Sequence, residues 1–427
     1  MNNLSQQQCD KLGDITDWIT QGPNPTFVDY VDIPCLTGRN ISNGRVTYDN
    51  ADYVSADTYA EYARFQLHAN DTLITLKGKG SIGKIGFVTT DKQAIFSRNI
   101  GVVRPNTNID AAYLNAYILS YYGQNMVLRG ETGGTGQSTL TCTYIKSLDI
   151  PRFNIEKQIG DLIRLSESVL TQANDCYKEA EQYLCDLLKI NKLILPEDNT
   201  SIVLASQSFA KTHRLDAEYY QPKYDKLFAL LEAYNTKTLS EIVNIKKSVE
   251  PGSEAYQTAG IPFIRVANLS KFGITDTDVY LSAEEYGDII RPEKDTILLS
   301  KDGSVGIAHK VEENTDIITS GAILHLTIKD DSVMPDYLTL VLNSIVVKMQ
   351  AERDAGGSVI QHWKPSEIEK VVIPILDNEV QVQITEKVQE SFALRKESVR
   401  LLELAKTAVE VAIEQGEDKA MELLTNK

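Results

Sequence analysis

Two stretches of the chain repeat an apolar or small residue at alternating steps of three and four positions, one over residues 159–187 and the other over residues 391–412. This spacing is that of a coiled-coil seam. The remaining positions are charged or polar, so each apolar stripe needs a partner. We therefore predict two helices of roughly 30–35 residues, about 45–50 Å long, packed on each other. The alternative is that each helix packs on its own domain.

Short apolar runs rich in β-branched residues precede each of these helices and are bounded by Gly, Asp or Lys, which predicts strands. The runs are residues 73–76, 85–88, 297–300 and 322–326. Two further segments, residues 111–121 and 335–349, are aliphatic and aromatic at helical spacing, and we expect helices there.

Three blocks of sequence occur twice in the same order, about 225 residues apart, a period too long for a solenoid unit. The blocks are residues 33–42, 71–83 and 133–151, which return as residues 261–270, 295–306 and 356–374. Each half is long enough to bury its own core. The expected fold class is α+β, with two duplicated β-rich α/β domains separated by two long helices packed as an antiparallel coiled coil. The expected boundaries are a domain at 1–152, a helical region at 153–190, a linker at 191–207, a second domain at 208–376 and a second helical region at 377–425.

The formal net charge of −16 argues against a simple nucleic-acid binder, because such proteins usually present a basic face. The charge is unevenly spread. Residues 1–150 carry 12 basic and 14 acidic side chains, whereas residues 201–376 carry 18 and 25. The first domain can therefore carry a local basic patch that binds DNA. The second domain is more acidic, so such a patch is less expected there.

No apolar run is long enough for a membrane span, the N-terminus lacks the pattern of a signal peptide, and the five cysteines form no Cys-x-x-Cys pair. These features predict a cytoplasmic protein. The histidines have no partner at metal-ligand spacing, and no nucleophile elbow, methylation signature or nuclease constellation occurs. Together these absences favour a protein that binds and does not catalyse.

The segment 78–84 matches the phosphate-loop pattern G-x-x-x-x-G-K, but Ile85 stands where a Ser or Thr should bind magnesium. The second copy, residues 301–307, has no lysine after its last glycine. A nucleotide-dependent enzyme is therefore disfavoured, and a tight turn between two strands is predicted. Lysines around such a turn suit contact with a phosphate backbone. The alternative is a hairpin with solvated lysines.

Residues 133–138 and 356–363 are small-residue loops that end in side chains able to read base edges. Glutamine bonds adenine through two hydrogen bonds, and arginine does the same to guanine. The alternative is an ordinary loop capped by polar residues.

Taken together, the repeated blocks and the two helices resemble the specificity (S) subunit of type I restriction–modification enzymes over essentially the whole chain. The motifs that carry the resemblance are residues 133–151, 214–224, 261–270, 295–306 and 356–374. No single motif is specific. The specific feature is that each copy closes with Gly-Gly-(Thr/Ser) and then Ile-Pro before a long helix.

The resemblance implies two target-recognition domains, each reading one half of a split, asymmetric sequence in double-stranded DNA. The two helical regions would set the spacing between the half-sites and dock two methyltransferase subunits, which restriction subunits join. The chain itself would be non-catalytic and bind no cofactor or metal, because S-adenosylmethionine, ATP and Mg²⁺ belong to the partner subunits. We expect weak, salt-sensitive DNA binding by the isolated chain, because an acidic subunit gains little from neutralising phosphates without basic partners.

The candidate DNA-binding residues are polar and basic side chains of the repeated blocks. In the first domain they are Arg39, Asn40, Lys77, Lys79, Lys84, Arg98, Gln137 and Ser138, and in the second Arg265, Asn268, Lys301, Ser304, Lys310, Gln361 and His362. The competing hypothesis is a DNA-mimicking or regulatory decoy on the same fold. A decoy should carry acidic side chains in place of Lys, Arg and Gln around the glycine turns, and the lysines of the first turn argue against it.

Overall fold

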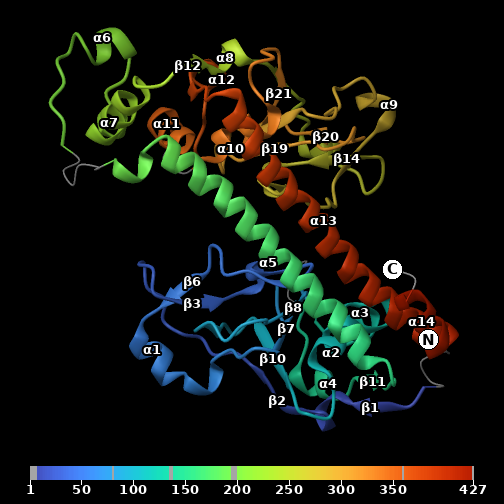
Figure 1. The fold of residues 1–427 in the computed structure, drawn as a ribbon. Coiled ribbons are helices and arrows are strands. Elements are labelled where there is room, and N and C mark those ends of the chain that lie inside the picture. The colour runs from blue at the N-terminus through green and yellow to red at the C-terminus, as the bar shows by residue number, and fades with distance from the viewer. Residues whose placement is uncertain (1–6, 79–80, 134–137, 194–199, 358–359, 426–427) are drawn as a thin grey trace. The chain divides into compact units, whose positions relative to one another are not determined.

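The computed structural model describes residues 7–78, 81–133, 138–193, 200–357 and 360–425 (Figure 1). The chain forms two compact units. Unit 1 contains Met1–Thr171 and Leu394–Lys427, and unit 2 contains Gln172–Ala393. Each unit thus holds one β-rich module and one half of each of two long helices.

The module of unit 1 consists of three sheets with helices packed against them. One sheet has the strand order β2-β10-β7-β8-β5-β4, a second has the order β6-β3-β9, and β1 pairs with β11. The strands are β1 (Cys9–Lys11), β2 (Thr16–Gln21), β3 (Ile33–Leu36), β4 (Ile41–Ser42), β5 (Gly44–Val46), β6 (Asp52–Val54), β7 (Thr72–Thr75), β8 (Ile85–Phe87), β9 (Ile95–Phe96), β10 (Ile100–Pro105) and β11 (Asp149–Pro151). The helices are α1 (Ala56–Glu61), α2 (Ala111–Leu119), α3 (Tyr121–Leu128), α4 (Cys142–Lys146) and α14 (Glu417–Thr425). The aromatic residues Tyr113 and Tyr117 of α2 lie in the buried core.

The module of unit 2 repeats this plan with a smaller main sheet, which has the order β13-β21-β18-β19. The others are β17-β14-β20, β15-β16 and β12-β22. The strands are β12 (Thr236–Thr238), β13 (Val243–Lys247), β14 (Ile261–Ile264), β15 (Leu269–Ser270), β16 (Gly273–Ile274), β17 (Tyr280–Leu281), β18 (Ile297–Ser300), β19 (Ala308–Lys310), β20 (Ile318–Thr319), β21 (Ile323–Ile328) and β22 (Val372–Pro374). The helices are α6 (Phe209–Thr212), α7 (Pro222–Leu231), α8 (Leu239–Ile242), α9 (Ala283–Tyr286), α10 (Pro335–Asn343), α11 (Ile345–Asp354) and α12 (Pro365–Ile368).

The two modules share their strand pairing, which confirms the predicted duplication. Strand β7 lies between β8 and β10 just as β18 lies between β19 and β21. The same buried hydrogen bond also recurs. The hydroxyl of Tyr113 donates to the carbonyl of Pro151 (2.6 Å), and the hydroxyl of Tyr337 donates to the carbonyl of Pro374 (2.7 Å). The Ile-Pro pair that closes each copy therefore anchors the first helix after the sheet.

The correspondence between the copies differs by one residue at β7 from the alignment that the sequence suggests. The sequence pattern matches Asp71 with Asp295. In the structure, Val88 donates its backbone N–H to the carbonyl of Asp71, and Val311 donates to the carbonyl of Thr296, both at 2.9 Å. Asp71 thus corresponds to Thr296. The sequence alignment is displaced because the turn that follows β18 is shorter than the turn that follows β7.

A single position explains why the main sheet has more strands in unit 1 than in unit 2. Gly86 on β8 pairs with Gly44 of β5, and a Cβ at Gly86 would lie 3.1 Å from the carbonyl oxygen of Arg45. A larger residue would therefore push β5 away. In unit 2 the corresponding residue is the buried His309, and the hairpin β15-β16 forms a separate sheet.

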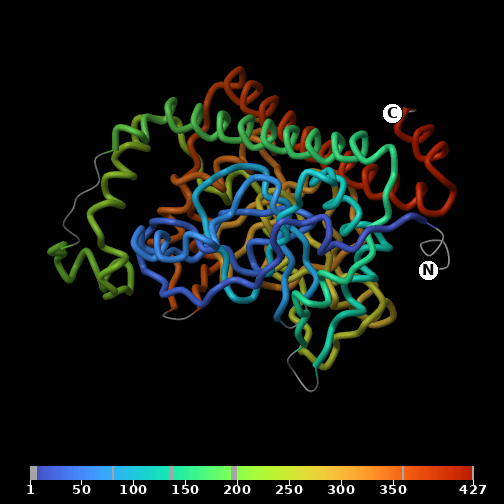
Figure 2. The backbone as a smooth tube through the Cα atoms, turned by 90° about the horizontal axis from the view of Figure 1, so that it is seen from below, coloured from blue at the N-terminus to red at the C-terminus, as the bar shows by residue number. Residues whose placement is uncertain are grey.

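The two long helices, α5 (Glu156–Leu187) and α13 (Asn378–Gln415), pack antiparallel, as predicted (Figures 1 and 2). Small residues form the contact. In unit 1 the hydroxyl of Ser398 donates to the carbonyl of Ser166, and in unit 2 the hydroxyl of Ser391 donates to the carbonyl of Ala173, each at 2.6 Å. These four residues are fully buried. A hydroxyl can reach a backbone carbonyl of the partner helix only if the two backbones approach closely, so the seam requires small side chains.

The hairpin β4-β5 of unit 1 contacts the helix pair through charge. The guanidinium of Arg45 donates to the Glu167 carboxylate (3.1 Å) and to the hydroxyls of Ser166 and Ser398. Burial raises the pKa of Glu167, although the Arg45 charge opposes this shift.

The corresponding hairpin of unit 2, β15-β16, contacts the helix pair through aromatic rings. The Phe272 ring lies 4.9 Å from that of Tyr177 and 6.5 Å from that of Phe392, measured between centroids. Phe392 follows Ser391 on α13 as Glu167 follows Ser166 on α5. The same place on the two helices therefore carries an ion pair in one unit and an aromatic cluster in the other.

We expect Ser398→Leu to destabilise unit 1 by about 1–3 kcal/mol, because the added methyl groups have no space in the buried seam. Ser398→Ala is the matched control, since alanine already occupies the corresponding contact at Ala173 in unit 2. It should cost only about 1 kcal/mol for the lost hydrogen bond. Chemical unfolding in a Trp363→Phe background, in which Trp18 reports on unit 1 alone, measures both variants. Equal losses for leucine and alanine would show that the seam tolerates bulk.

Among the helices of the described residues, none is both long and apolar enough to cross a membrane. All five cysteines are free thiols.

Candidate nucleic-acid interface

In unit 1 the glycine turn between β7 and β8 lies against the Gly-Gly loop. The N–H of Leu140 donates to the carbonyl of Leu76 (2.9 Å), and Lys77 forms a β-bridge with Thr139. Thr139 and Thr132 also exchange backbone hydrogen bonds, which closes the loop on itself. Two segments that are far apart in the sequence therefore meet.

Basic and polar side chains gather where these segments meet. Ser138 precedes Thr139 and is half-buried, as is Lys77, while Lys84 at the end of the turn is exposed. The N–H of Leu76 donates to the carbonyl of Asn99 (2.8 Å), so the exposed Arg98 lies beside the base of the turn.

Arg39 lies at the same edge of the sheet. A Cβ at the preceding Gly38 would be 3.3 Å from Cγ2 of Thr75, the last residue before the turn, and 4.0 Å from the Ser81 hydroxyl within it. The Arg39 side chain is 55% exposed and is paired with Asp52. This pair is accessible to solvent, so it is weak and can exchange for a phosphate or base contact. The backbone contacts thus place Arg39, Lys77, Lys84, Arg98 and Ser138 around one turn of unit 1.

Unit 2 joins the same two segments, with different side chains at the junction. The N–H of Trp363 donates to the carbonyl of Lys301 (2.8 Å), and the N–H of Gly303 donates to the carbonyl of Gln361 (2.9 Å). Asp302 and His362 form the β-bridge that corresponds to Lys77 and Thr139 in unit 1. Their side chains also contact each other, with His362 Nδ1 2.8 Å from the Asp302 carboxylate.

The surface of unit 2 is consequently less basic than that of unit 1. Lys301 is only 9% exposed and donates to the neighbouring Asp302 carboxylate. Burial acts to raise the pKa of Asp302, but the hydrogen bonds from Lys301 and His362 outweigh it and lower that pKa. The exposed groups at the junction are Ser304, Gln361 and His362.

Two candidates turn out to stabilise the local fold. Asn40 is fully buried, and its side chain accepts from the N–H of Thr37 (2.9 Å) and donates to the carbonyl of Asp49 (3.2 Å). It caps the short 3₁₀ turn after β3 and is not available to a base. Asn268 caps the equivalent turn by accepting from the N–H of Arg265 (3.2 Å). The buried, capping side chain of Asn40 therefore does not support its prediction as a DNA-binding residue.

Lys310 is also misplaced by the sequence prediction. It lies at the end of β19, its side chain is 6% exposed, and its ammonium is 3.1 Å from the equally buried Asp336 carboxylate. Burial opposes the charged form, but Asp336 and Glu312 outweigh it and raise the pKa of Lys310. Lys310 is part of a buried ion pair, so its side chain is not accessible for contact with a ligand at the surface.

The remaining candidates are one half-buried arginine and two residues outside the described part of the chain. Arg265 is half-buried, and its guanidinium lies 3.4 Å from Asp278 on the far side of the 3₁₀ turn. Lys79 and Gln137 lie outside the described residues.

Sequence reasoning missed Asp302, Thr139 and Trp363, which build the junction between the two segments. Trp363 is 1% exposed and packs under the loop of unit 2. Asp302 adjoins a predicted lysine, and its role becomes visible only when the one-residue shift at β7 and β18 is known. A correct alignment of the two turns from sequence would have pointed to it.

No group of three or more His, Cys, Asp or Glu side chains that could hold a metal ion occurs among the described residues. The junction in each unit instead presents hydrogen-bond donors and acceptors on two adjoining loops. Such a surface can position a phosphate backbone and read base edges.

Comparison with known proteins finds similarity at the level of both sequence and structure. The sequence model described as the type I restriction modification DNA specificity domain matches residues 232–398. The chain is similar to the type I restriction enzyme EcoBI specificity subunit of Escherichia coli, with 24% identity over 157 residues. That match covers 36% of this chain and 32% of the relative, so it spans about a third of the relative's length.

Two solved structures are similar over most of their length. The crystal structure of the type I restriction–modification system S subunit from M. genitalium has a TM-score of 0.39 and 14% identity, and the match covers 98% of this chain and 93% of that chain. The HsdS subunit from Thermoanaerobacter tengcongensis has a TM-score of 0.31 and 15% identity, and the match covers 96% of this chain and 97% of that chain.

Proposed function

Because the chain belongs to the family of type I restriction–modification specificity subunits, we propose that it recognises duplex DNA and performs no chemistry of its own. The observation that carries the proposal is the junction of the glycine turn with the Gly-Gly loop, which recurs in both units. Each junction supports its own set of accessible polar groups. A duplicated surface of this kind suits a target read in two parts.

We assign different balances of contacts to the two modules. In unit 1 the exposed Lys84 and Arg98 suit phosphate contacts and bidentate readout of guanine. In unit 2 Gln361 and His362 offer hydrogen bonds to base edges with little positive charge around them. Each module would then read one half of a split, asymmetric site, and the α5–α13 pair would set the distance between the halves.

The partners that we propose are two methyltransferase subunits docked on the helical regions, with restriction subunits joining them. S-adenosylmethionine, ATP and Mg²⁺ would be bound by those subunits. The net charge of −16 supports a partner-dependent complex, because an acidic chain alone gains little from counterion release. A decoy that mimics DNA would need acidic groups at both junctions, and the basic groups at the junction of unit 1 disfavour it.

Substitutions in one module should change one half-site only. If Arg98 reads a base, Arg98→Ala should cost about 1–3 kcal/mol of discrimination between bases at one position of the half-site. Lys84→Ala should weaken binding to all sequences alike and reduce the slope of log K against log salt concentration by about one. Gln361→Ala should relax the other half-site alone. Sequencing of the methylome in cells that express the complete system reads out both half-sites.

The matched control is Lys11→Ala, which removes the same charge as Lys84→Ala but lies on β1, in a separate two-stranded sheet. It should leave the methylated sequence unchanged. If Arg98→Ala and Gln361→Ala altered the same half-site, the assignment of one module to each half would be wrong.

A further inference from the structure

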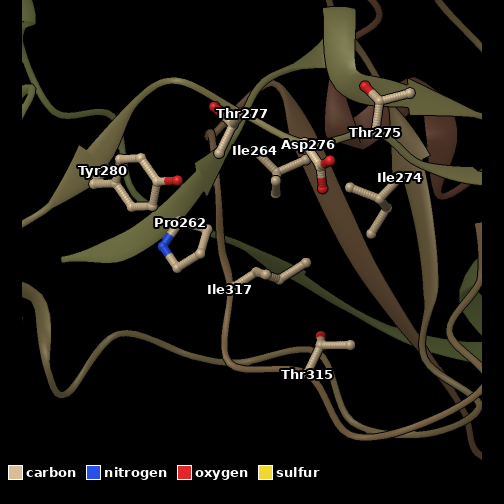
Figure 3. Close-up of a pocket in the computed structure, with 9 residues that line it drawn as sticks. All are labelled: Pro262, Ile264, Ile274, Thr275, Asp276, Thr277, Tyr280, Thr315 and Ile317. Carbon is tan, nitrogen blue, oxygen red and sulfur yellow. The ribbon is translucent and has the colours of Figure 1, made fainter. Parts of the chain in front are cut away.

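Unit 2 contains an apolar pocket that the proposed DNA recognition does not use (Figure 3). Its volume is about 310 Å³, and Ile264 of β14, Ile274 of β16 and Ile317 before β20 approach the same space. Pro262 and Tyr280 form one end of it, and Asp276 is the only charged group among the described residues of the lining.

The corresponding place in unit 1 is filled by the ring of Tyr48. Tyr48 and Val46 pack against the small core that contains Leu36 and Ala94. The strand registers match Leu36, Val46 and Ala94 with Ile264, Ile274 and Ile317. The Lys92 ammonium lies over this ring, 4.4 Å from its centroid. Unit 1 thus closes the space with an aromatic ring that carries a cation on its outer face.

The pocket is open in unit 2 because one residue is absent from its loop. In unit 1, Thr47 donates its N–H to the carbonyl of Asn40, and the Asn40 side chain donates to the carbonyl of Asp49. The equivalent bonds of Asn268 in unit 2 involve Thr275 and Asp276, which are adjacent in the sequence. Thr47 and Asp49 therefore match Thr275 and Asp276, and Tyr48, which lies between them in unit 1, has no counterpart in unit 2.

The rim of the pocket is acidic. Asp276 is exposed and has no ion pair among the described residues. Two further carboxylates nearby, Asp278 and Asp316, are 91% and 83% exposed and make contacts with Arg265 (3.4 Å) and Arg291 (2.9 Å). Two of these carboxylates are neutralised by arginines, so Asp276 is the group of the rim that attracts a cation.

We propose that the pocket is a docking site for a partner protein that inserts an aromatic side chain flanked by a basic residue. The ring would occupy the space among the three isoleucines, as Tyr48 does in unit 1. The basic residue would face Asp276, as Lys92 covers Tyr48. This inference does not depend on how either module reads DNA.

Methyl NMR of the full chain labelled at isoleucine δ1 tests the site with three capped dipeptides, because the partner is unidentified. Ac-Lys-Tyr-NH2 should shift the methyl signals of Ile264, Ile274 and Ile317. Ac-Glu-Tyr-NH2 should bind roughly tenfold more weakly, a difference of about 1.4 kcal/mol. Ac-Lys-Ala-NH2 should give no shifts at these methyls.

Two variants provide the controls. Insertion of a tyrosine between Thr275 and Asp276 reproduces the loop of unit 1 and should abolish binding. Asp276→Asn leaves the pocket open and should give the two tyrosine peptides equal affinity. The proposal is overturned if no peptide shifts these methyls, if the wild-type chain binds the acidic and basic peptides equally, or if adenosine or thymidine binds where the peptides do not.

Discussion

Replacing Lys310 with methionine should destabilise unit 2 by about 3–5 kcal/mol, because the change leaves the Asp336 carboxylate buried without its cation. The two groups lie 3.1 Å apart, and both side chains are 6% exposed. Gln389 donates to the other carboxylate oxygen (2.9 Å) but cannot neutralise the charge. The measurement is chemical unfolding in a Trp18→Phe background, in which the buried Trp363 reports on unit 2 alone.

The duplicated fold supplies a control for this prediction. Phe87 and Ala112 occupy in unit 1 the positions of Lys310 and Asp336 in unit 2, and both belong to the apolar core. The double variant Lys310→Phe with Asp336→Ala should therefore recover most of the lost stability, since the buried charges are removed together. A single variant that loses less than about 1 kcal/mol would contradict the assignment of a buried ion pair.

Unit 2 should also lose stability as the pH falls below about 6.5, because two of its histidines are buried in the neutral form. Burial lowers the pKa of both His309 and His325 to about 4. At His325 the second largest cause is the charge of Lys246, which lies opposite it on β13 and lowers the pKa further. At His309 the charge of Lys310 also lowers the pKa, but it is the smallest of three causes. A backbone hydrogen bond involving Lys271 opposes the shift at His309.

The folded-state pKa of each histidine lies below the unfolded value. The contribution of the neutral, buried histidines to the free energy of unfolding is therefore complete above pH 6.5 and is lost as the pH falls toward 4. It amounts to at most about 3 kcal/mol for each histidine. Unfolding of unit 2 followed through Trp363 between pH 7 and pH 5 measures the slope, a window in which most carboxylates stay ionised.

His325→Val is the matched variant, because Val102 occupies the corresponding position on β10 of unit 1. In the wild type, His325 Nε2 lies 2.8 Å from the Thr319 hydroxyl, so the valine loses one hydrogen bond and the variant is less stable at pH 7. Its stability should nevertheless fall less steeply with pH than that of the wild type. Parallel slopes for the two proteins would rule out His325 as a source of the pH dependence.

The long helices, the duplication and the meeting of turn and loop could be predicted because they depend on patterns that survive in one sequence. The alternation of steps along α5 and α13 reports directly on the packed seam. The Gly-Gly and Ile-Pro pairs recur in the same order, one on each side of the short helices α4 and α12.

The individual site residues were harder to predict, because burial in these short strands depends on pairing partners and not on local sequence. The segment Ala308-His309-Lys310 appears solvent-exposed in sequence, yet all three residues are buried. Asn40 looks like a base reader until its capping bonds are known. The sequence alignment is displaced by one residue at β18, so it matches Lys77 with Lys301. The structure matches Lys77 with Asp302, because these two residues form the corresponding bridges to the loop.

The hairpin of unit 1 contacts the helices through the Arg45–Glu167 ion pair, and the hairpin of unit 2 contacts them through the aromatic ring of Phe272. The helix surface that each module contacts is therefore chemically different. If the module of unit 1 were transplanted onto the helix segments of unit 2, the guanidinium of Arg45 would meet the ring of Phe392 in place of the Glu167 carboxylate. The transplanted cation would lose its partner in a mostly buried position. A recombinant chain that acquires a new module must therefore inherit the helix surface beneath it. Crossover points compatible with a folded hybrid should lie within α5 and α13, beyond these contacts, and not where the sheets end.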